Sequence, residues 1–269
     1  MARTAGIVLD LFARTEHHRY GPSRQNRADL HVPRADGTHP VVVLLHGGYW
    51  RATYGKIVMK PLAADLVRRG YATWNIEYRR IGRRQGGGYP QTFDDVRAAL
   101  RQLADLGDDR LDLDDVTLVG HSAGGQLALW VAARDDAGLR PQRVIAQAPV
   151  VDLVATAGAH ELMGGRPEEL RDRYTECDPM QQLPLSMPVL IVHGPRDATV
   201  PLGRSRKYVE AARAAGGDVA LVEPDEGGHR AHIDPRSEAW RVAVEWLERH
   251  RGAPAAGVSP RSSGQPAAR

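Results

Sequence analysis

The sequence predicts one α/β domain in which a mostly parallel central sheet is flanked by helices. Short apolar runs, rich in β-branched residues, recur along the chain, and a longer helical pattern follows most of them. A helix between successive strands implies crossover connections, which join parallel strands. The size agrees with this, because 269 residues with 42% hydrophobic content suffice for one sizeable core.

The apolar runs are continuous rather than alternating, which is typical of strands that are covered on both faces. The predicted strands are residues 41–45, 72–76, 116–119, 143–148, 189–192 and 219–222. The predicted helices are residues 61–69, 92–106, 123–134, 203–215 and 235–250. Ligands of open parallel sheets bind at the carboxyl ends of the strands, so the loops after these runs should carry the chemistry.

Two segments depart from this alternation. Residues 150–187 lie between two predicted strands, contain Gly164, Gly165 and several prolines, and are expected to form a lid-like insertion. Residues 252–269 are rich in Ala, Pro, Ser and Gly and contain two arginines and no acid. Such a segment buries too little apolar surface to fold, so we expect a disordered tail. The predicted organisation is a single domain over residues 1–251, followed by this tail.

Charge and composition restrict the partners. The chain has 36 basic and 33 acidic residues, a net charge of +3 and a pI of about 9.2. Its arginines lie beside acidic residues along most of the chain, as on a solvated surface, so we expect no nucleic-acid partner. No apolar run reaches the ~18 residues of a membrane span. Residues 6–13 are interrupted by Asp10 and lack a cleavage pattern, so we expect no secretory signal and a cytoplasmic protein. A homodimer is possible.

A serine stands in a setting suited to nucleophilic catalysis. Gly120-His-Ser122-Ala-Gly124 follows the predicted strand at 116–119 and opens an apolar helix, which is the G-x-S-x-G pattern in its strand–turn–helix context. The glycines are needed because neighbouring side chains would collide in the sharp turn. A serine hydroxyl is a poor nucleophile by itself, so it also needs a base, an orienting acid and donors for an oxyanion.

The loop after the strand at 41–45 supplies candidate donors. It reads His46-Gly47-Gly48-Tyr49-Trp50, and its two glycines allow the backbone to approach a ligand closely. We expect the amides of Gly47 and Gly48, together with that of Ala123, to form an oxyanion hole. Tyr49 and Trp50 are expected to line an aromatic substrate pocket, with packing against the insertion as the alternative.

The acid and the base are expected after the last two strands. Asp197 follows the strand at 189–192, and the order Ser, Asp, His is the one found in this type of fold. Two histidines compete for the role of base. His229 follows a pair of glycines, whereas His232 lies just before Asp234, the expected N-cap of the final helix. We expect His229 to be the base. A metal site at the two histidines is not expected, because their spacing suits a helix and the segment is a glycine-rich loop.

These four loops, in this order, resemble those of the serine α/β-hydrolase superfamily, and the resemblance extends from residue 20 to residue 250. The pentapeptide at 46–50 resembles the oxyanion motif of kynurenine formamidases (arylformamidases). Bacterial carboxylesterases and feruloyl-esterase-like enzymes carry similar loops, and residues 75–79, 86–90 and 94–96 resemble the second strand and the following helix of those groups. The resemblance implies an α/β-hydrolase fold, with Ser122 as nucleophile, His229 as base and Asp197 as acid, and with no cofactor and no metal.

Several functions remain open at this point. The leading hypothesis is a serine hydrolase that cleaves a small carboxylic ester. The alternative is an arylformamidase acting on N-formylkynurenine, and a third reading is a catalytically silent fold used for binding. Four arginines after the strand at 72–76 could attract a carboxylate, although a solvated loop that pairs with the insertion is the simpler expectation; they are Arg79, Arg80, Arg83 and Arg84. Cys177, the single cysteine, excludes an internal disulfide.

Overall fold

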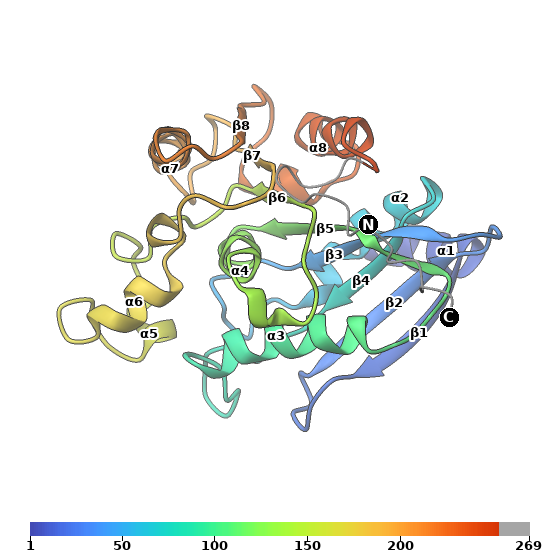
Figure 1. Ribbon diagram of the computed structural model, residues 1–269, viewed down its shortest axis with the longest axis horizontal. Helices are drawn as coiled ribbons and strands as arrows, with labels where there is room; N and C mark the ends of the chain where they lie inside the picture. Colours follow the sequence, from blue (N-terminus) through green and yellow to red (C-terminus); the bar gives the residue numbers. More distant parts are fainter. Residues whose placement is uncertain (253–269) are drawn as a thin grey trace, which may run out of the picture.

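A computed structural model describes residues 1–252, without the side chains of residues 2 and 3. The predicted tail at 252–269 lies outside the described residues, apart from Gly252. An eight-stranded sheet runs through the molecule in the order β1-β2-β4-β3-β5-β6-β7-β8 (Figure 1). Its strands are β1 (Ala13–Arg19), β2 (Arg27–Pro33), β3 (His39–Leu45), β4 (Ala72–Ile76), β5 (Leu111–His121), β6 (Arg143–Gln147), β7 (Val189–Val192) and β8 (Val219–Val222).

The parallel part of the sheet contains all six predicted strands. β3 to β8 pair in parallel, whereas β1 pairs antiparallel with β2, and β2 pairs antiparallel with β4. The sequence pattern does not reveal these two antiparallel strands. β1 reads Ala-Arg-Thr-Glu-His-His-Arg and leaves most of its side chains exposed or half-buried, because it is an edge strand with little apolar surface. The predicted mostly parallel α/β architecture is confirmed.

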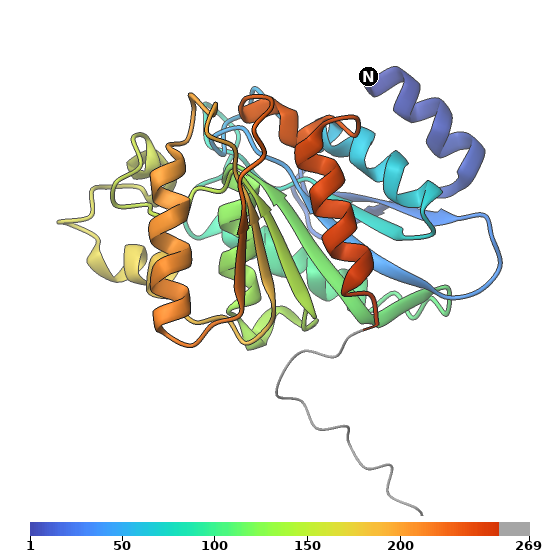
Figure 2. The ribbon, with the colours of Figure 1, turned by 90° about the horizontal axis from the view of Figure 1, so that it is seen from above.

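Helices cover both faces of the sheet (Figures 1 and 2). One face carries α3 (Gln91–Ala104), α4 (Ala123–Ala132) and α7 (Leu202–Ala214), and the other carries α1 (Ala2–Phe12), α2 (Lys60–Arg68) and α8 (Glu238–Arg249). β3 shows how one strand serves two cores. Val41, Val43 and Leu45 pack into the first core, and Val42 and Leu44 pack into the second, because successive side chains of a strand point to opposite faces.

The final helix begins later than predicted. The expected N-cap, Asp234, instead accepts a hydrogen bond from the amide of Arg236 at 3.0 Å, within a turn. The N-cap of α8 is Ser237, whose hydroxyl accepts from the amide of Trp240 at 3.1 Å. The residues before this turn form a short 3₁₀ helix, η4 (His229–Ile233). The candidate base therefore lies at the start of a helical turn rather than at the apex of an open loop.

The segment predicted as a lid lies beside α4 (Figure 1). It contains α5 (Ala159–Met163), α6 (Arg171–Cys177) and η3 (Pro179–Gln181); the other 3₁₀ helices are η1 (Lys56–Met59) and η2 (Asp135–Ala137). Side chains of α4 hold it, because Gln126 donates to the carbonyl of Cys177 at 2.9 Å and Trp130 donates to that of Glu176 at 3.1 Å. Burial raises the pKa of the Cys177 thiol well above its usual value, so this thiol is unreactive.

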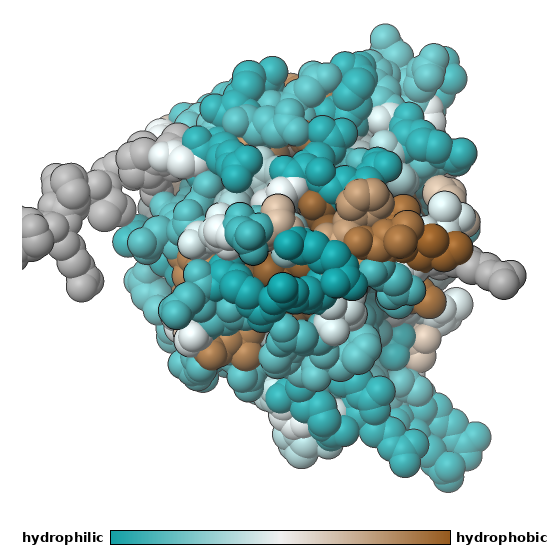
Figure 3. Space-filling view, turned by 90° about the vertical axis from the view of Figure 1, so that its right-hand side faces the viewer, coloured by the Kyte–Doolittle hydropathy of each residue, from teal (hydrophilic) through white to brown (hydrophobic). Residues whose placement is uncertain are grey.

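The outer side of α1 is apolar. Ile7, Leu11 and Phe12 are 57%, 64% and 50% exposed, and an apolar patch is visible on this side of the molecule (Figure 3). The inner side of α1 is anchored by Ala5 and Leu9, which pack into the second core. Among residues 1–252, no helix combines the length and the apolar composition that crossing a bilayer requires.

Candidate active site

The two loops that carry the nucleophile motif and the glycine pair leave adjacent strands. β3 is hydrogen-bonded to β4 on one side and to β5 on the other, and Leu45 of β3 pairs with Gly120 of β5. The chain crosses from β3 to β4 and then from β4 to β5, so the strand order reverses here. In open α/β sheets, such a switch point leaves a crevice at the carboxyl ends of the strands.

Ser122 occupies a strained turn at this point. Its φ of 55° and ψ of −117° place a non-glycine residue in a sparsely populated region, between the end of β5 and the start of α4. At this turn, α4 packs directly against the loop that follows β3. A Cβ on Gly124 would overlap the carbonyl oxygens of Leu45 and His46. The glycine of the motif is therefore required by a close backbone approach.

A cavity of about 190 Å³ opens at these strand ends. It is lined by Gly47, Gly48, Tyr49, Tyr54, Val58, His121, Ser122, Thr199, His229, Arg230 and Ile233. The structure thus brings the predicted nucleophile, the predicted base, both predicted oxyanion glycines and Tyr49 to one cavity. Residues 150–187 do not line this cavity.

Unpaired amides occur in the two loops that line the cavity with Ser122. A Cβ on Gly47 would lie 3.0 Å from the Cβ of Ser122, so the glycine loop touches the serine. Ala123 is the first residue of α4, and its amide has no acceptor within the helix. Among the described residues, the amides of Gly47, Gly48 and Ala123 donate to no other protein group. These are the donors predicted for an oxyanion hole.

The prediction for Trp50 is wrong. Its side chain is 1% exposed, and its indole N–H donates to Oε1 of Gln126 at 3.1 Å. Trp50 therefore belongs to the core under α4 and does not line the cavity. Its neighbour Tyr49 is 40% exposed and does line it. Both residues have positive φ angles, so the chain reverses sharply here and sends consecutive side chains to different environments.

Asp197 holds His229. Oδ2 of Asp197 lies 2.7 Å from Nδ1 of His229, and Oδ1 accepts from the amides of Thr199 and Val200 at 2.8 and 2.9 Å. Burial by itself raises the pKa of Asp197, but these hydrogen bonds and one from His193 outweigh burial and hold the pKa well below its usual value. The carboxylate stays ionised, and His229 presents its other nitrogen away from Asp197.

Two side chains from strand ends position η4. His121 donates from Nε2 to the carbonyl of His229 at 3.0 Å, and Gln147 donates to the carbonyl of His232 at 2.9 Å. His232 is 2% exposed, and burial together with the electrostatic influence of the neighbouring His193 and His229 rings lowers its pKa to about 3. His232 does not line the cavity. His229 does line it and also contacts Asp197.

His193 supports the acid, a role that the sequence did not reveal. Its side chain is fully buried, and Nε2 lies 3.3 Å from Oδ2 of Asp197 and 3.0 Å from the carbonyl of Val200. Both partners are acceptors, so Nε2 carries the proton, and Nδ1 can accept from the hydroxyl of Ser205 at 2.8 Å. The position of His193 directly after β7, in the loop that carries Asp197, is the sequence feature that could have indicated this role.

The expected arginine cluster is largely engaged in structure. Arg79 pairs with Asp95 at 2.7 Å, and Arg80 donates to Gln25 at 2.8 Å. The cavity instead contains Arg230, which forms no ion pair or side-chain hydrogen bond within residues 1–252. In the same part of the chain, no three His, Cys, Asp or Glu side chains are grouped so as to hold a metal ion.

Comparison with known proteins identifies the family. The family model named BD-FAE matches residues 28–211, which is more than half of the chain. The chain belongs to the BD-FAE family. The matched range includes the glycine loop, Ser122 and Asp197, and it ends before His229. As a BD-FAE member, the chain is an esterase-like protein of the α/β-hydrolase superfamily, as the sequence resemblance implied.

Curated relatives of this BD-FAE chain are longer than it is. It is 30% identical over 247 residues to the esterase LipQ of Mycobacterium tuberculosis, an alignment that covers 81% of this chain and 57% of that protein. It is 26% identical to the acylamino-acid-releasing enzyme of Rattus norvegicus, over 79% of this chain and 32% of that enzyme. The chain thus spans about half or less of the length of these relatives.

Solved structures share the fold of this BD-FAE chain. A truncated carbohydrate esterase from gut microbiota superposes with a TM-score of 0.78 at 18% identity, covering 89% of this chain and 97% of that one. Esterase B of Lactobacillus rhamnosis superposes with a TM-score of 0.74 at 23% identity, covering 92% and 90%. At these identities the likeness concerns the fold, and the predicted α/β-hydrolase fold is confirmed.

Proposed function

We propose that the chain is a serine hydrolase that cleaves a small carboxylic ester. One observation carries the proposal: Ser122 and His229 line the same cavity, and Nδ1 of His229 is held 2.7 Å from Oδ2 of Asp197. In this arrangement Ser122 is the nucleophile, His229 the base and Asp197 the acid that orients the base. The esterase names of its relatives support the same reaction class.

The reaction would run through an acyl-enzyme. His229 takes the proton of the Ser122 hydroxyl through Nε2 while the oxygen attacks the ester carbonyl. The resulting oxyanion is stabilised by the unpaired amides of Gly47, Gly48 and Ala123. The leaving alcohol receives the proton from His229, and a water activated by the same histidine then hydrolyses the acyl-enzyme. Asp197 stays ionised throughout and stabilises the imidazolium form.

The cavity suits a small, mostly apolar group. Its volume of about 190 Å³ is below the ~300–1,000 Å³ that is usual for sites of drug-sized ligands. Tyr54, Val58 and Ile233 contribute apolar wall, and Tyr49 stands partly exposed at the edge. A short acyl chain fits this description. The same residues could attack the formyl carbon of N-formylkynurenine, and no feature of the cavity favours that amide over an ester.

A substrate panel on matched variants tests the proposal. Short p-nitrophenyl esters and N-formylkynurenine are assayed with wild type and with Ser122→Ala. We expect turnover of the esters by wild type and a loss in kcat of about 10⁴- to 10⁶-fold in the variant, with an unchanged circular dichroism spectrum. Ester turnover retained by Ser122→Ala would refute the serine mechanism. A kcat/KM for the formamide that exceeds the ester values by orders of magnitude would replace the ester assignment.

A further inference from the structure

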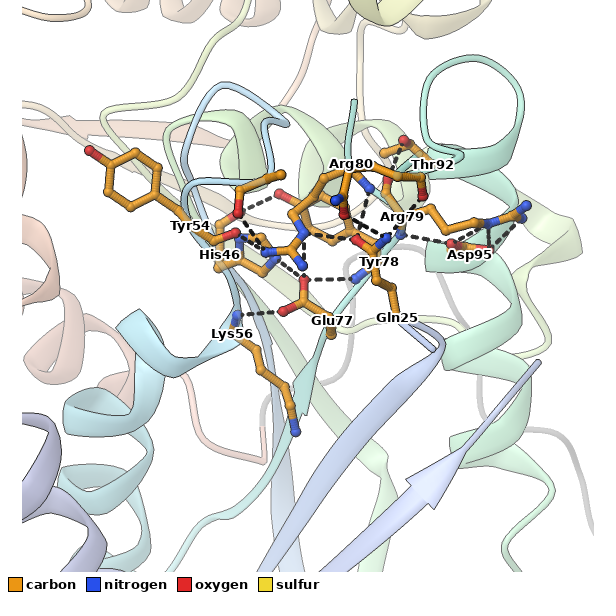
Figure 4. Close-up of polar contacts among 12 residues, drawn as sticks. Gln25, His46, Tyr54, Lys56, Glu77, Tyr78, Arg79, Arg80, Thr92 and Asp95 are labelled. Atoms are coloured by element: carbon orange, nitrogen blue, oxygen red, sulfur yellow. Dashed lines mark hydrogen bonds and ion pairs between the residues drawn. The ribbon is translucent and has the colours of Figure 1, made fainter. Parts of the chain in front are cut away.

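His46, which opens the glycine loop, is buried together with a carboxylate. Its side chain is 1% exposed, and Nε2 lies 2.7 Å from Oε1 of Glu77, at the end of β4 (Figure 4). Its other nitrogen, Nδ1, lies 2.8 Å from the carbonyl oxygen of Gly47. The carbonyl of Gly47 is an acceptor, so Nδ1 of His46 faces it as the hydrogen-bond donor. The Glu77 carboxylate is the partner of the same ring on its other side.

The surroundings fix this pair on every side. The ring of His46 stacks on Tyr78 with centroids 4.2 Å apart, and the Tyr78 hydroxyl donates to the carbonyl of His46 at 2.7 Å. Oε2 of Glu77 accepts from the amide of Lys56 at 3.1 Å. Burial alone raises the pKa of Glu77, but its contacts with His46, Arg80 and the Lys56 amide outweigh burial, and the pKa is lowered. The carboxylate is therefore ionised.

The geometry of one peptide links this pair to the candidate oxyanion hole. The carbonyl of Gly47 and the N–H of Gly48 belong to the same planar trans peptide, so they point in opposite directions. His46 draws that carbonyl toward the buried side of the loop. The N–H of Gly48 consequently points away from His46, and Gly48 lines the cavity that contains Ser122.

The loop needs such a restraint. Gly48, Tyr49 and Trp50 have φ angles of 120°, 54° and 57°, three consecutive positive values of which two belong to bulky residues. Backbone of this kind persists only where the surrounding contacts determine it, at a cost of roughly 1–3 kcal/mol per strained residue. Glu77 also restrains the far side of the cavity, because it holds the start of η1, which carries Val58.

We propose that the His46–Glu77 ion pair is a positioning element that turns the Gly47–Gly48 peptide so that the Gly48 amide faces the oxyanion formed at Ser122. This inference rests on the proposed serine mechanism. It predicts that the pair acts on the transition state, because a misdirected amide weakens stabilisation of the oxyanion and leaves ground-state binding of the ester unchanged. His46 and Glu77 touch neither the substrate nor the reacting atoms.

The test compares two neighbouring ion pairs. Glu77→Gln keeps the shape and one acceptor but removes the carboxylate charge beside His46. Asp95→Asn, the matched control, breaks the adjacent Arg79–Asp95 pair at 2.7 Å, which makes no contact with His46 (Figure 4). With p-nitrophenyl butyrate we expect kcat to fall about 10- to 100-fold in Glu77→Gln with KM within twofold, and to stay within twofold of wild type in Asp95→Asn.

A tetrahedral-adduct inhibitor separates positioning from general damage. A short-chain trifluoromethyl ketone adds to the serine and places an oxyanion in the hole. Its Ki should rise in Glu77→Gln by the same factor by which kcat/KM falls, and Glu77→Asp should recover part of both. A normal kcat and a normal Ki in folded Glu77→Gln, in a protein whose Ser122→Ala variant is inactive, would overturn the positioning role and leave the serine mechanism intact.

A measurement on wild type covers the case in which Glu77→Gln does not fold. In protein labelled with ¹⁵N-histidine, the ring of His46, recognised by its contacts with Tyr78, should carry a proton on Nδ1, the nitrogen that faces the carbonyl of Gly47. A His46 ring without a proton on Nδ1 would contradict the proposal, because the carbonyl of Gly47 would then have no donor on His46. Activity retained by Ser122→Ala would instead remove the proposed function itself.

Discussion

Nδ1 of His229 lies 2.7 Å from Oδ2 of Asp197, although the two residues are 32 positions apart in the chain. The contact joins the loops after β7 and β8, which are adjacent parallel strands. It fixes the tautomer of the histidine, because the ionised carboxylate can only accept a hydrogen bond, which Nδ1–H must donate. Nε2 is thereby left as the free acceptor, which is the form that a general base for Ser122 requires.

The choice between the two histidines of η4 can be measured directly. We expect His229→Ala to lower kcat on a short ester by about 10⁴- to 10⁶-fold, because the base is removed. His232→Gln should stay within about tenfold of wild type, since His232 is buried outside the cavity and its pKa of about 3 keeps it neutral. Equal losses in both variants, with both proteins folded, would contradict the assignment of the base.

Asp197→Asn should keep the fold and lose most of the activity. The amide can still accept from the Thr199 and Val200 amides, but it can offer an N–H to His229 and so favour the wrong tautomer. We expect kcat to fall about 10⁴-fold and KM to change little. Ester kinetics together with thermal unfolding check this. A fall in kcat below tenfold would exclude Asp197 as the orienting acid.

Arg230 should bias the enzyme toward esters that carry an anionic group. It is the one permanently charged side chain in the cavity lining, and it has no ion-pair partner within the described residues. We expect Arg230→Gln to lower kcat/KM for p-nitrophenyl hemisuccinate about threefold to tenfold and to leave p-nitrophenyl butyrate unchanged, with a smaller effect at high salt.

The control for this preference is Arg236→Gln. Arg236 is exposed, pairs with Asp234 at 2.9 Å and lies outside the cavity. Arg236→Gln should leave kcat/KM unchanged for both esters. A similar drop with both esters in Arg230→Gln would indicate a general effect on the site rather than recognition of an anion.

Acid should destabilise the fold through buried neutral histidines. His31 in β2 is 1% exposed, and burial lowers its pKa to about 4. An unfolded histidine titrates near 6.5, so between pH 6.5 and 4 the unfolded state binds the extra proton, and stability falls as pH falls. Over this pH range the loss in unfolding free energy amounts to about 3 kcal/mol, because a shift of one pKa unit equals about 1.4 kcal/mol.

Denaturant unfolding at several pH values measures this loss. His31→Gln removes the titrating ring and keeps an acceptor for the Thr15 hydroxyl, which lies 2.9 Å from Nδ1 of His31. The variant should show a flatter dependence of the unfolding free energy on pH between 4 and 6.5. His160→Gln, at an exposed position, should follow wild type. An unchanged slope in His31→Gln would refute the contribution of His31.

The sequence by itself determined the parallel sheet and the strand ends that carry the candidate site. Both depend on local patterns: continuous apolar runs form buried strands, and the turn at Ser122 needs glycine at position 124. Since parallel strands end at one edge of a sheet, Gly47, Gly48, Ser122, Asp197 and His229 could be assigned to one region from their order alone.

Only the tertiary structure decided which side chains of each loop face the cavity. Tyr49 and Trp50 are adjacent, yet packing against Gln126 of α4 buries Trp50. His229 and His232 share one turn, and contacts from β5 and β6 orient that turn. These decisions depend on contacts between elements distant in the chain, and no local pattern encodes them. The burial of His46 with Glu77 belongs to the same class, because β3 and β4 must pair before the two residues meet.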